Sequence, residues 1–547
     1  MIRSEHIDRF RPSFAGLSFA TVFLCVSLTP SLLPRTWVSQ GLVSGIAAAI
    51  GYGTGVVLGW LTRKLVRFRP TPRTISRAWK TLAVLAAALV SLSLYQGARW
   101  QREIFRLMGE HPPVRFGYLG VLLLSLLVGT GLVVLVRLLR WTVRALSRLL
   151  TRWVPAVAAQ LVATVTVVGL LVALLDGVVY DRALQLAVSI SDTNNAVISP
   201  NLAQPTSPTR SGSPQSLADW SSLGLQGRAF VTGGPTAEQL RRFSGSPPAE
   251  PIRVYAGLAS APSLADRATL AVRELVRTGA FSRKVLCVVF TTGTGWVDPR
   301  AASSLEYMYN GDSALVGMQY STLPSWISFA VEREKSTAAA RELFNRVYAQ
   351  WSTLPPGQRP KLLVFGESLG SYGGEGAFSG IEDIRHRVDG ALWIGPTHGN
   401  RLWSDLVAHR DAGTPQVLPV YQGGTTVRFA GDPADLTAPP GTWSQPRIVY
   451  LQHASDPITW WSPDLLVRRP DWLAERPGRD VLDAMRWYPF VTFFQVSADL
   501  AFAGKPRTGH GHRFGAETVA AWAAIAPPPG WTARDTARLS GLVDPRG

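Results

Sequence analysis

Five long apolar stretches in the first 180 residues limit the architecture of this chain more than any other feature. They run approximately over residues 14–33, 38–61, 82–97, 116–136 and 154–179. A helix needs about 20 apolar residues to cross the hydrocarbon core of a bilayer, and all but the third stretch reach that length. The first lacks the small-x-small site of a cleaved signal peptide. We therefore predict a five-span α-helical transmembrane domain over residues 1–182, rather than the buried helices of a soluble protein.

The basic residues are concentrated in the same region. Residues 1–152 contain 20 Lys and Arg but only 4 Asp and Glu, which accounts for most of the net charge of +18. A nucleic-acid binder would carry this charge on a folded domain, so we predict no nucleic-acid partner. The basic loops between spans two and three and between spans four and five are typical of cytoplasmic loops. This predicts a multi-pass protein of a bacterial inner membrane, with everything after Tyr180 outside the cytoplasm.

The stretch that follows is rich in Ser, Pro and Asn between residues 191 and 216. Such a composition buries too little apolar surface to order itself and is typical of a tether. We predict a linker over residues 183–222.

Residues 223–547 alternate between short β-branched runs and longer amphipathic runs. The expected strands are 252–258, 285–290, 314–320, 361–365, 390–394 and 447–451, and the expected helices are 264–277, 330–351, 401–410, 481–503 and 517–525. This alternation indicates βαβ units, and hence an α/β domain whose mostly parallel sheet has helices on both faces.

A strand that runs directly into Gly366-Glu-Ser-Leu-Gly370 is the central chemical motif. In a Gly-x-Ser-x-Gly elbow the serine occupies a sharp, strained turn, so its hydroxyl stands above the sheet. The two glycines leave room for the backbone to close this turn. We therefore predict that Ser368 is a nucleophile.

A serine nucleophile needs a base, and the base needs an acid to orient it. Asp456 follows the expected strand 447–451 by a short turn, which is the place for the acid, although a turn-capping role is the simpler alternative. Two histidines, His510 and His512, lie in one glycine-rich turn near the C-terminus. Two imidazoles are too few for a usual zinc site. One of them is expected to be the base, with a slight preference for His510.

The remaining predicted site residues concern the oxyanion hole and the substrate. The main-chain N–H of Leu369 is one expected donor, and the loop after strand 285–290 supplies the other, through Thr294 or Gly295. Trp296, His398 and Trp460 are candidates for lining the substrate site. The chain has only two cysteines, no complete dinucleotide-binding glycine motif and no phosphate-binding loop, so we predict no metal and no cofactor.

Taken together, these motifs resemble a bacterial α/β-hydrolase family with an N-terminal multi-span membrane domain. The resemblance is carried by Thr-Gly-Thr-Gly-Trp at 292–296, Gly-Asp at 311–312, Gln-Tyr-Ser at 319–321, the elbow at 366–370, Ser-Asp-Pro at 455–457 with Trp-Trp at 460–461, and Gly-His-Gly-His at 509–512. It implies a hydrolase fold and a Ser/Asp/His triad. The chain departs from the general plan in one respect, because a helix rather than a strand is expected before the histidine turn.

The sequence thus predicts a membrane-anchored serine hydrolase, esterase- or lipase-like, that acts on a lipid or cell-envelope ester. An envelope acyltransferase that uses the same acyl-enzyme is the alternative, and a non-catalytic membrane scaffold is a third. The expected partners are the bilayer and a lipid or acylated envelope substrate.

Overall fold

The computed structural model describes residues 12–65, 71–113, 117–199 and 201–545, and the chain forms two compact units. The helical unit comprises Met1–Ala183 and Trp461–Phe502, and the sheet unit comprises Leu184–Trp460 and Ala503–Gly547. This division differs from the predicted boundaries in one important way. Residues 461–502, expected within a continuous domain over 223–547, belong to the helical unit.

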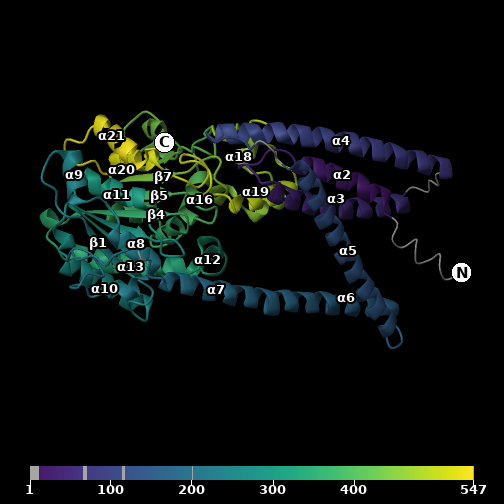
Figure 1. The fold of residues 1–547 in the computed structure, drawn as a ribbon, viewed down its shortest axis with the longest axis horizontal. Helices are drawn as coiled ribbons and strands as arrows, with labels where there is room; N and C mark the ends of the chain where they lie inside the picture. The colour runs from purple at the N-terminus through teal and green to yellow at the C-terminus, as the bar shows by residue number, and fades with distance from the viewer. Residues whose placement is uncertain (1–11, 66–70, 114–116, 200, 546–547) are drawn as a thin grey trace. The chain divides into compact units, whose positions relative to one another are not determined.

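The helical unit is built from long apolar helices (Figure 1). Its main elements are α2 (Phe14–Ser27), α3 (Trp37–Leu65), α4 (Pro72–Leu107), α5 (Tyr118–Leu150), α6 (Ala156–Ala173), a π-helical turn (Leu174–Tyr180), α18 (Asp471–Ala474) and α19 (Val491–Leu500), while α7 (Asp181–Ala196) leads into the sheet unit. Among the described residues, four helices are long and apolar enough to cross a membrane: Trp37–Leu65, Pro72–Leu107, Tyr118–Leu150 and Ala156–Ala196. Phe116, expected to begin the fourth span, lies outside the described residues.

The first predicted span is wrong in its length. Instead of continuing to residue 33, α2 ends at Ser27 after 14 residues. Pro30 and Pro34 follow, and proline cannot continue a helix because it lacks the N–H and its ring clashes with the preceding turn. The hydrophobic pattern alone could not reveal this end, since most of the residues up to 33 remain apolar.

Small residues bring the helices of this unit close together. A side chain at Gly55 would come within 2.2 Å of the Ala15 carbonyl oxygen on α2, and one at Gly45 within 2.7 Å of Val128 on α5. Such close approach is typical of helix packing in membranes. The outward faces carry exposed aliphatic side chains, among them Leu119, Leu127 and Val157. Exposed apolar surface on this scale fits a membrane-embedded N-terminal region.

The segment 461–502 is held in the helical unit by a buried polar cluster. Helix α19 packs against α2 and α3, and Asp499 accepts hydrogen bonds from the Ser31 hydroxyl and from the Leu32 main-chain N–H. Arg35 forms a buried ion pair with Asp499, with Nε and Oδ1 3.0 Å apart. The predicted helix 481–503 is shorter than expected. Residues 481–490 form turns and irregular structure, and the helix begins only at Val491.

The sheet unit contains a parallel sheet of seven strands within the described residues. The strands are β1 (Ile252–Ala256), β2 (Val285–Phe290), β3 (Ser313–Met318), β4 (Lys361–Glu367), β5 (Gly390–Ile394), β6 (Val427–Ala430) and β7 (Arg447–Leu451), in the order β1-β3-β2-β4-β5-β7-β6. Six of them match predicted strands. The edge strand β6 was not predicted, because four residues give too short a pattern. All seven point their carboxyl ends to one edge, where ligands of open α/β sheets bind.

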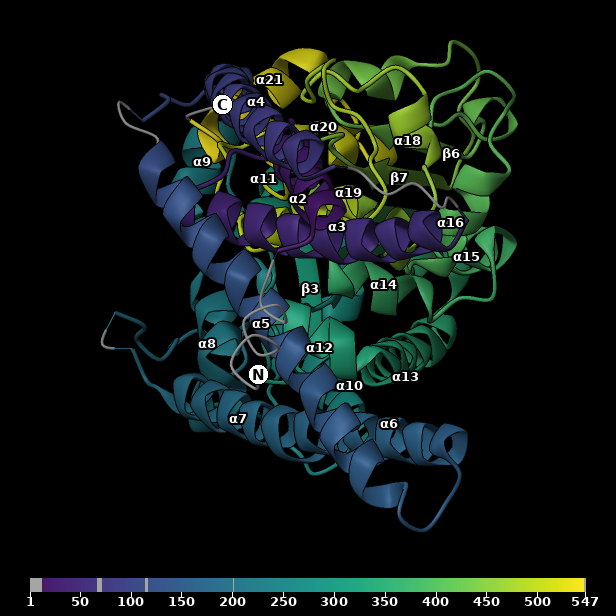
Figure 2. The same ribbon diagram turned by 90° about the vertical axis from the view of Figure 1, so that its right-hand side faces the viewer.

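Helices cover both faces of this sheet, as predicted (Figures 1 and 2). One face carries α10 (Leu264–Arg277), α13 (Arg333–Ser352) and α14 (Leu369–Glu375), and the other carries α11 (Pro299–Met308), α20 (Ala516–Ile525) and α21 (Ala533–Val543). The shorter helices include α8 (Gly224–Thr232), α9 (Ala237–Ser244), α12 (Ser325–Val331), α15 (Ile381–Arg387), α16 (Arg401–Ala408) and α17 (Pro457–Trp460). The burial of every residue of β2, β3 and β5 explains their continuous apolar runs.

The predicted linker is largely ordered. Helix α7 occupies its first part, and Arg210 then forms a parallel bridge with Arg253 of β1. The guanidinium of Arg210 donates to the carbonyls of Val231 and Gly233. Residues 209–211 thus pair with β1 at the edge of the sheet. An argument from composition cannot detect this pairing, because its hydrogen bonds are made by main-chain groups.

Candidate active site

Ser368 occupies a strained turn between β4 and α14. Its φ of 55° and ψ of −120° lie in a region that residues with side chains rarely adopt. Its main-chain N–H donates to the carbonyl of Ile394 at the end of β5. The side chain is half-buried and remains partly accessible. These are the features of the predicted elbow.

Gly366 and Gly370 are required by close backbone contacts. A Cβ at Gly366 would lie 2.5 Å from the Gly370 carbonyl oxygen, and a Cβ at Gly370 would lie 2.2 Å from the Phe290 carbonyl oxygen. The second contact also sets the end of β2 directly against the elbow. The two glycines therefore allow the turn and bring the predicted oxyanion loop beside it.

Asp456 and His512 are hydrogen-bonded to each other, with Nδ1 and Oδ2 2.7 Å apart. Asp456 is fully buried and also accepts from the main-chain N–H of Ile458. The His512 side chain keeps 14% of its surface exposed. A carboxylate bonded to Nδ1 holds the imidazole so that Nε2 is the nitrogen left for exchange with a reactant.

The acid loop and the histidine turn are joined by two further bonds. Gly511 donates its N–H to the Ser455 hydroxyl, and its carbonyl lies 2.8 Å from Nδ1 of His453. The His453 ring also stacks on Phe514, with centroids 4.3 Å apart. Positions 453, 455 and 456 thus all contact residues 511–512. The sequence placed Ser455 in the Ser-Asp-Pro motif at 455–457, but it did not indicate that Ser455 or His453 contacts the histidine turn.

Gly395 places the imidazole of His512 next to the serine turn. This glycine follows Ile394, which accepts the Ser368 N–H, and it has a φ of +52°. A Cβ here would come within 2.3 Å of Cε1 of His512. The serine turn and the imidazole therefore flank the same pair of residues at the end of β5. Sequence reasoning missed Gly395.

The preference for His510 over His512 is wrong on this geometry. The main chain of His510 closes the turn, since its N–H donates to Arg507 and its carbonyl accepts from Arg513. Asp456 instead bonds to the histidine two positions later. Alternation of Gly and His gave no basis for choosing between them, because the choice depends on which way each side chain leaves the turn.

The predicted oxyanion loop forms a tight turn after β2. The N–H of Gly295 donates to the Thr292 carbonyl, so it is already used, while its own carbonyl accepts from the Tyr255 hydroxyl. Gly295 is therefore a turn residue rather than a free donor. The main-chain N–H groups of Leu369 and Thr294 have no hydrogen-bond acceptor among the described residues. They stay candidates for the two donors.

Of the predicted lining residues, Trp460 is misassigned. It is only 2% exposed, and its indole N–H donates to the His453 carbonyl, so it fills the core. Trp296 and His398 are half-buried. The His398 ring contacts Phe329 of α12, which in turn contacts Tyr372 four residues after Ser368. This aromatic cluster adds Phe329 and Tyr372 as lining candidates that the sequence did not indicate.

A buried carboxyl group lies immediately before the serine. Glu367 is 6% exposed, and its Oε2 has no hydrogen-bond partner among the described residues. Burial, followed by the negative charges of Asp298 and Asp456, raises its pKa well above the ordinary value, while Arg300 opposes this only in part. The site around Glu367 therefore favours the neutral form of its carboxyl group over the ionised form.

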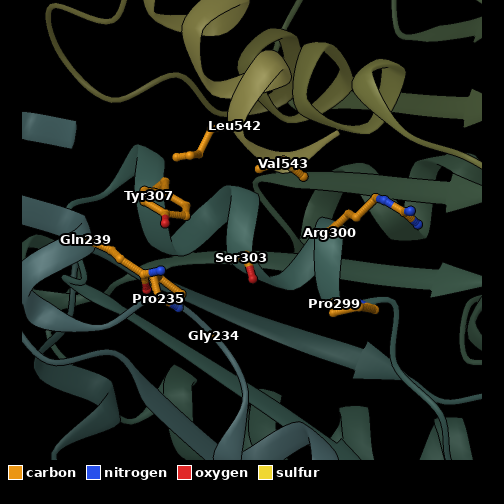
Figure 3. A pocket seen from close by; sticks show the side chains of 9 residues that line it. All are labelled: Gly234, Pro235, Gln239, Pro299, Arg300, Ser303, Tyr307, Leu542 and Val543. Carbon is orange, nitrogen blue, oxygen red and sulfur yellow. The ribbon is translucent and has the colours of Figure 1, made fainter. Parts of the chain in front are cut away.

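A separate cleft of about 450 Å³ opens elsewhere in the sheet unit (Figure 3). It is lined by residues of α9, α11 and α21, including Gln239, Ser303 and Leu542, and none of Ser368, Asp456 and His512 borders it. The Arg300 side chain points away from the other lining residues (Figure 3). Among the described residues, no group of three or more His, Cys, Asp or Glu side chains could hold a metal ion.

Comparisons with known proteins agree with this architecture. A family model described as the alpha/beta-hydrolase family matches residues 252–539, and a second, described as the N-terminus of that family, matches residues 28–235. No curated protein and no solved structure matches the chain. The first model covers more than half of the sequence, including every strand and the residues Ser368, Asp456 and His512. The chain therefore belongs to the alpha/beta-hydrolase family.

Proposed function

We propose that this protein is a serine hydrolase in which Ser368 is the nucleophile, His512 the general base and Asp456 the residue that orients His512. The observation that carries the proposal is the 2.7 Å bond between Asp456 and His512, beside a serine in a strained elbow. An orienting carboxylate with a partly open imidazole is what an acyl-transfer reaction requires.

In the proposed reaction the Ser368 oxygen attacks the carbonyl carbon of an ester while Nε2 of His512 takes its proton. The N–H groups of Leu369 and Thr294 would hold the negative charge on the carbonyl oxygen. His512 then gives the proton to the departing alcohol, and the acyl group remains on Ser368. Water, deprotonated by the same imidazole, releases the acid and restores the serine.

A fluorophosphonate probe tests the nucleophile, because it reacts with activated serines and requires no knowledge of the substrate. We expect the purified full-length protein to be labelled and Ser368→Ala to lose labelling completely. Ser379→Ala is the matched control, since this serine is exposed and lies beyond α14. Labelling that persists in Ser368→Ala would refute the assignment.

We further propose that the sheet unit faces away from the cytoplasm. Helix α3 has Arg63 and Lys64 in its last turn, whereas Asp499 of the segment 461–502 binds Leu32 and Arg35 just before its first turn. Basic ends of membrane helices face the cytoplasm. The segment thus lies at the opposite end of α3, and it is joined directly to the sheet unit at residues 460 and 503. This argument for the orientation uses the two ends of α3 and not the number of spans. It therefore holds whether or not the short helix α2 crosses the membrane.

A topology reporter fused after Gly547 tests this orientation. A reporter that is active only outside the cytoplasm should be active, and one that is active only inside should be silent; the reverse pattern would overturn the orientation.

The substrate that we propose is an ester of a lipid or of another acylated envelope component. The aromatic cluster of Phe329, Tyr372 and His398 near the elbow offers apolar contacts for an acyl chain. Product analysis with purified envelope esters tests this and also shows whether water or an alcohol accepts the acyl group. Turnover of short soluble esters combined with none of any envelope ester would count against it.

A further inference from the structure

An apolar groove within the helical unit has one polar end. It has a volume of about 530 Å³ and is lined by α2, α3, α4 and α5, with Leu17, Leu24, Ala49, Val90 and Val133 among its wall residues. This volume is in the range of ligand sites in proteins. Because all four helices belong to one compact unit, the groove does not depend on how the two units are placed.

The hydroxyl groups in the wall are already satisfied by the main chain. Thr21 donates to the Leu17 carbonyl, Thr130 to the Leu126 carbonyl, and Ser125 to the carbonyls of Val121 and Gly41. Apart from Tyr52 at the polar end, the wall therefore presents no hydroxyl proton to an occupant. Such a surface suits a hydrocarbon chain and disfavours a polar solute, whose hydrogen bonds would be lost on entry.

At the polar end, Arg137 donates to the Tyr52 hydroxyl across 2.8 Å, and the same oxygen accepts from the Ser13 N–H. The Tyr52 hydroxyl proton is thus left to be donated, together with the other guanidinium N–H groups of Arg137. Helices α2, α3 and α5 contain no Asp or Glu that could balance the arginine charge. This end is built to receive an anion.

The position of Arg137 along α5 identifies the kind of anion. It is the first basic residue after the apolar part of the helix, and Arg140, Arg144 and Arg148 follow it. Leu122, which also lines the groove, precedes it by 15 residues, or about 22 Å at 1.5 Å per residue. Arg137 therefore lies at the level where lipid phosphates meet the hydrocarbon core, and the groove extends from there into the core.

We propose that this groove binds one acyl chain of an anionic phospholipid, whose phosphate is held by Arg137 and the Tyr52 hydroxyl. The site lies at the basic end of the spans and is formed by the helical unit, whereas the proposed ester substrate site is formed by the sheet unit. It gives the protein a resident lipid, independent of whether Ser368 is a nucleophile.

Native mass spectrometry of the detergent-purified full-length protein tests the proposal. Phosphatidylglycerol and phosphatidylcholine with the same acyl chains are titrated in turn. We expect phosphatidylglycerol to bind more tightly, and Arg137→Gln to weaken it about tenfold, as expected for loss of one charge-assisted contact. Arg140→Gln is the matched control, because Arg140 is exposed on the same helix, and it should change affinity less than about twofold.

A second variant tests the apolar part. Ala49→Phe would fill the groove and should weaken both lipids, while soluble glycerol phosphate should displace neither. Equal binding by Arg137→Gln and the unmodified chain, or equal affinity for the two lipids, would overturn the anion site. Unchanged binding by Ala49→Phe, or displacement by glycerol phosphate, would overturn the acyl-chain site. A severalfold gain in bound lipid on removal of residues 2–11 would show that the N-terminal segment fills the groove instead.

Discussion

Two histidine–carboxylate pairs lie side by side at the carboxyl edge of the sheet, and they differ in what surrounds them. His512 bonds to Asp456 and keeps part of its ring exposed, whereas His453 lies 3.3 Å from Glu517 and is 2% exposed. The His453 ring is enclosed by Phe514 and the Gly511 carbonyl. Similar residue types thus form an accessible pair and an enclosed one, and accessibility is what the proposed general base requires in order to exchange a proton with a reactant.

The enclosed pair supports the accessible one. His453 and Ser455 fix Gly511, and the next residue is the proposed base. Substitutions in the two pairs should therefore separate loss of chemistry from loss of stability.

The largest effect should come from the accessible pair. We expect His512→Gln or Asp456→Asn to lower kcat for a model ester by about 10³–10⁴-fold, because proton transfer or orientation of the imidazole is lost. Melting temperatures in detergent should change little. His453→Gln is the matched comparison, and we expect it to lose about 1–3 kcal/mol of stability through Gly511 but less than tenfold in kcat. Equal activity losses in the two pairs would contradict the distinction.

A smaller but still large effect should follow from Gly395→Ala. Its Cβ would collide with the His512 ring, and φ at this position is unfavourable for alanine. We expect kcat to fall about 10²-fold, as for a displacement of the base by about 1 Å. Gly413→Ala is the control, because it has a φ of +83° but open space around the side chain. A similar loss in both variants would assign the effect to backbone strain alone.

The next comparison concerns pH. Because the pKa of Glu367 is raised in the folded protein, its carboxyl group loses its proton at a lower pH in the unfolded chain than in the folded one. Folding therefore becomes less favourable as pH rises from the ordinary glutamate pKa of about 4.3 towards the folded-state pKa. Glu367→Gln removes that dependence. Its melting temperature relative to the unmodified protein should therefore rise between pH 4 and pH 8. Parallel melting curves across this range would show that Glu367 titrates normally.

The smallest effect should be that of His510. Because its main chain closes the turn and Asp456 bonds to His512, His510→Gln should retain kcat within about threefold, which is far less than the loss on removing a general base. A loss as large as that of His512→Gln would return the base to position 510. Steady-state kinetics on the same model ester decides this.

The sequence predicted the features that depend on local pattern. The interior strands were found because they are continuously apolar. The sharp turn at Ser368 was found from its two glycines, which the sequence retains because a Cβ at either position would come within 2.5 Å or 2.2 Å of a main-chain oxygen. The fold class and the family were confirmed. Local pattern could not predict features that depend on the direction of a side chain or on main-chain contacts between distant segments. These features are the choice of His512, the contact of Gly395 with the His512 ring, and the bridge of Arg210 to β1.

The membrane region shows the same limit. Hydropathy identified the long helices but extended the first through residues 28–33, where Pro30 and a buried polar cluster end it. The polar partner of that cluster is Asp499, 464 positions after Arg35. No sequence window includes both residues, so the assignment of 461–502 to the helical unit could not be predicted.

That assignment has a practical consequence for anyone who wishes to crystallise the sheet unit without detergent. Cutting the gene before residue 201, which keeps the residues that pair with β1, would leave α19 with its buried carboxylate exposed and no Arg35 to neutralise it, and the fragment should precipitate. A soluble version should be reached by a second excision, in which 461–502 is replaced by a short Gly/Ser bridge and β7, Asp456 and the terminal histidine turn are left in place.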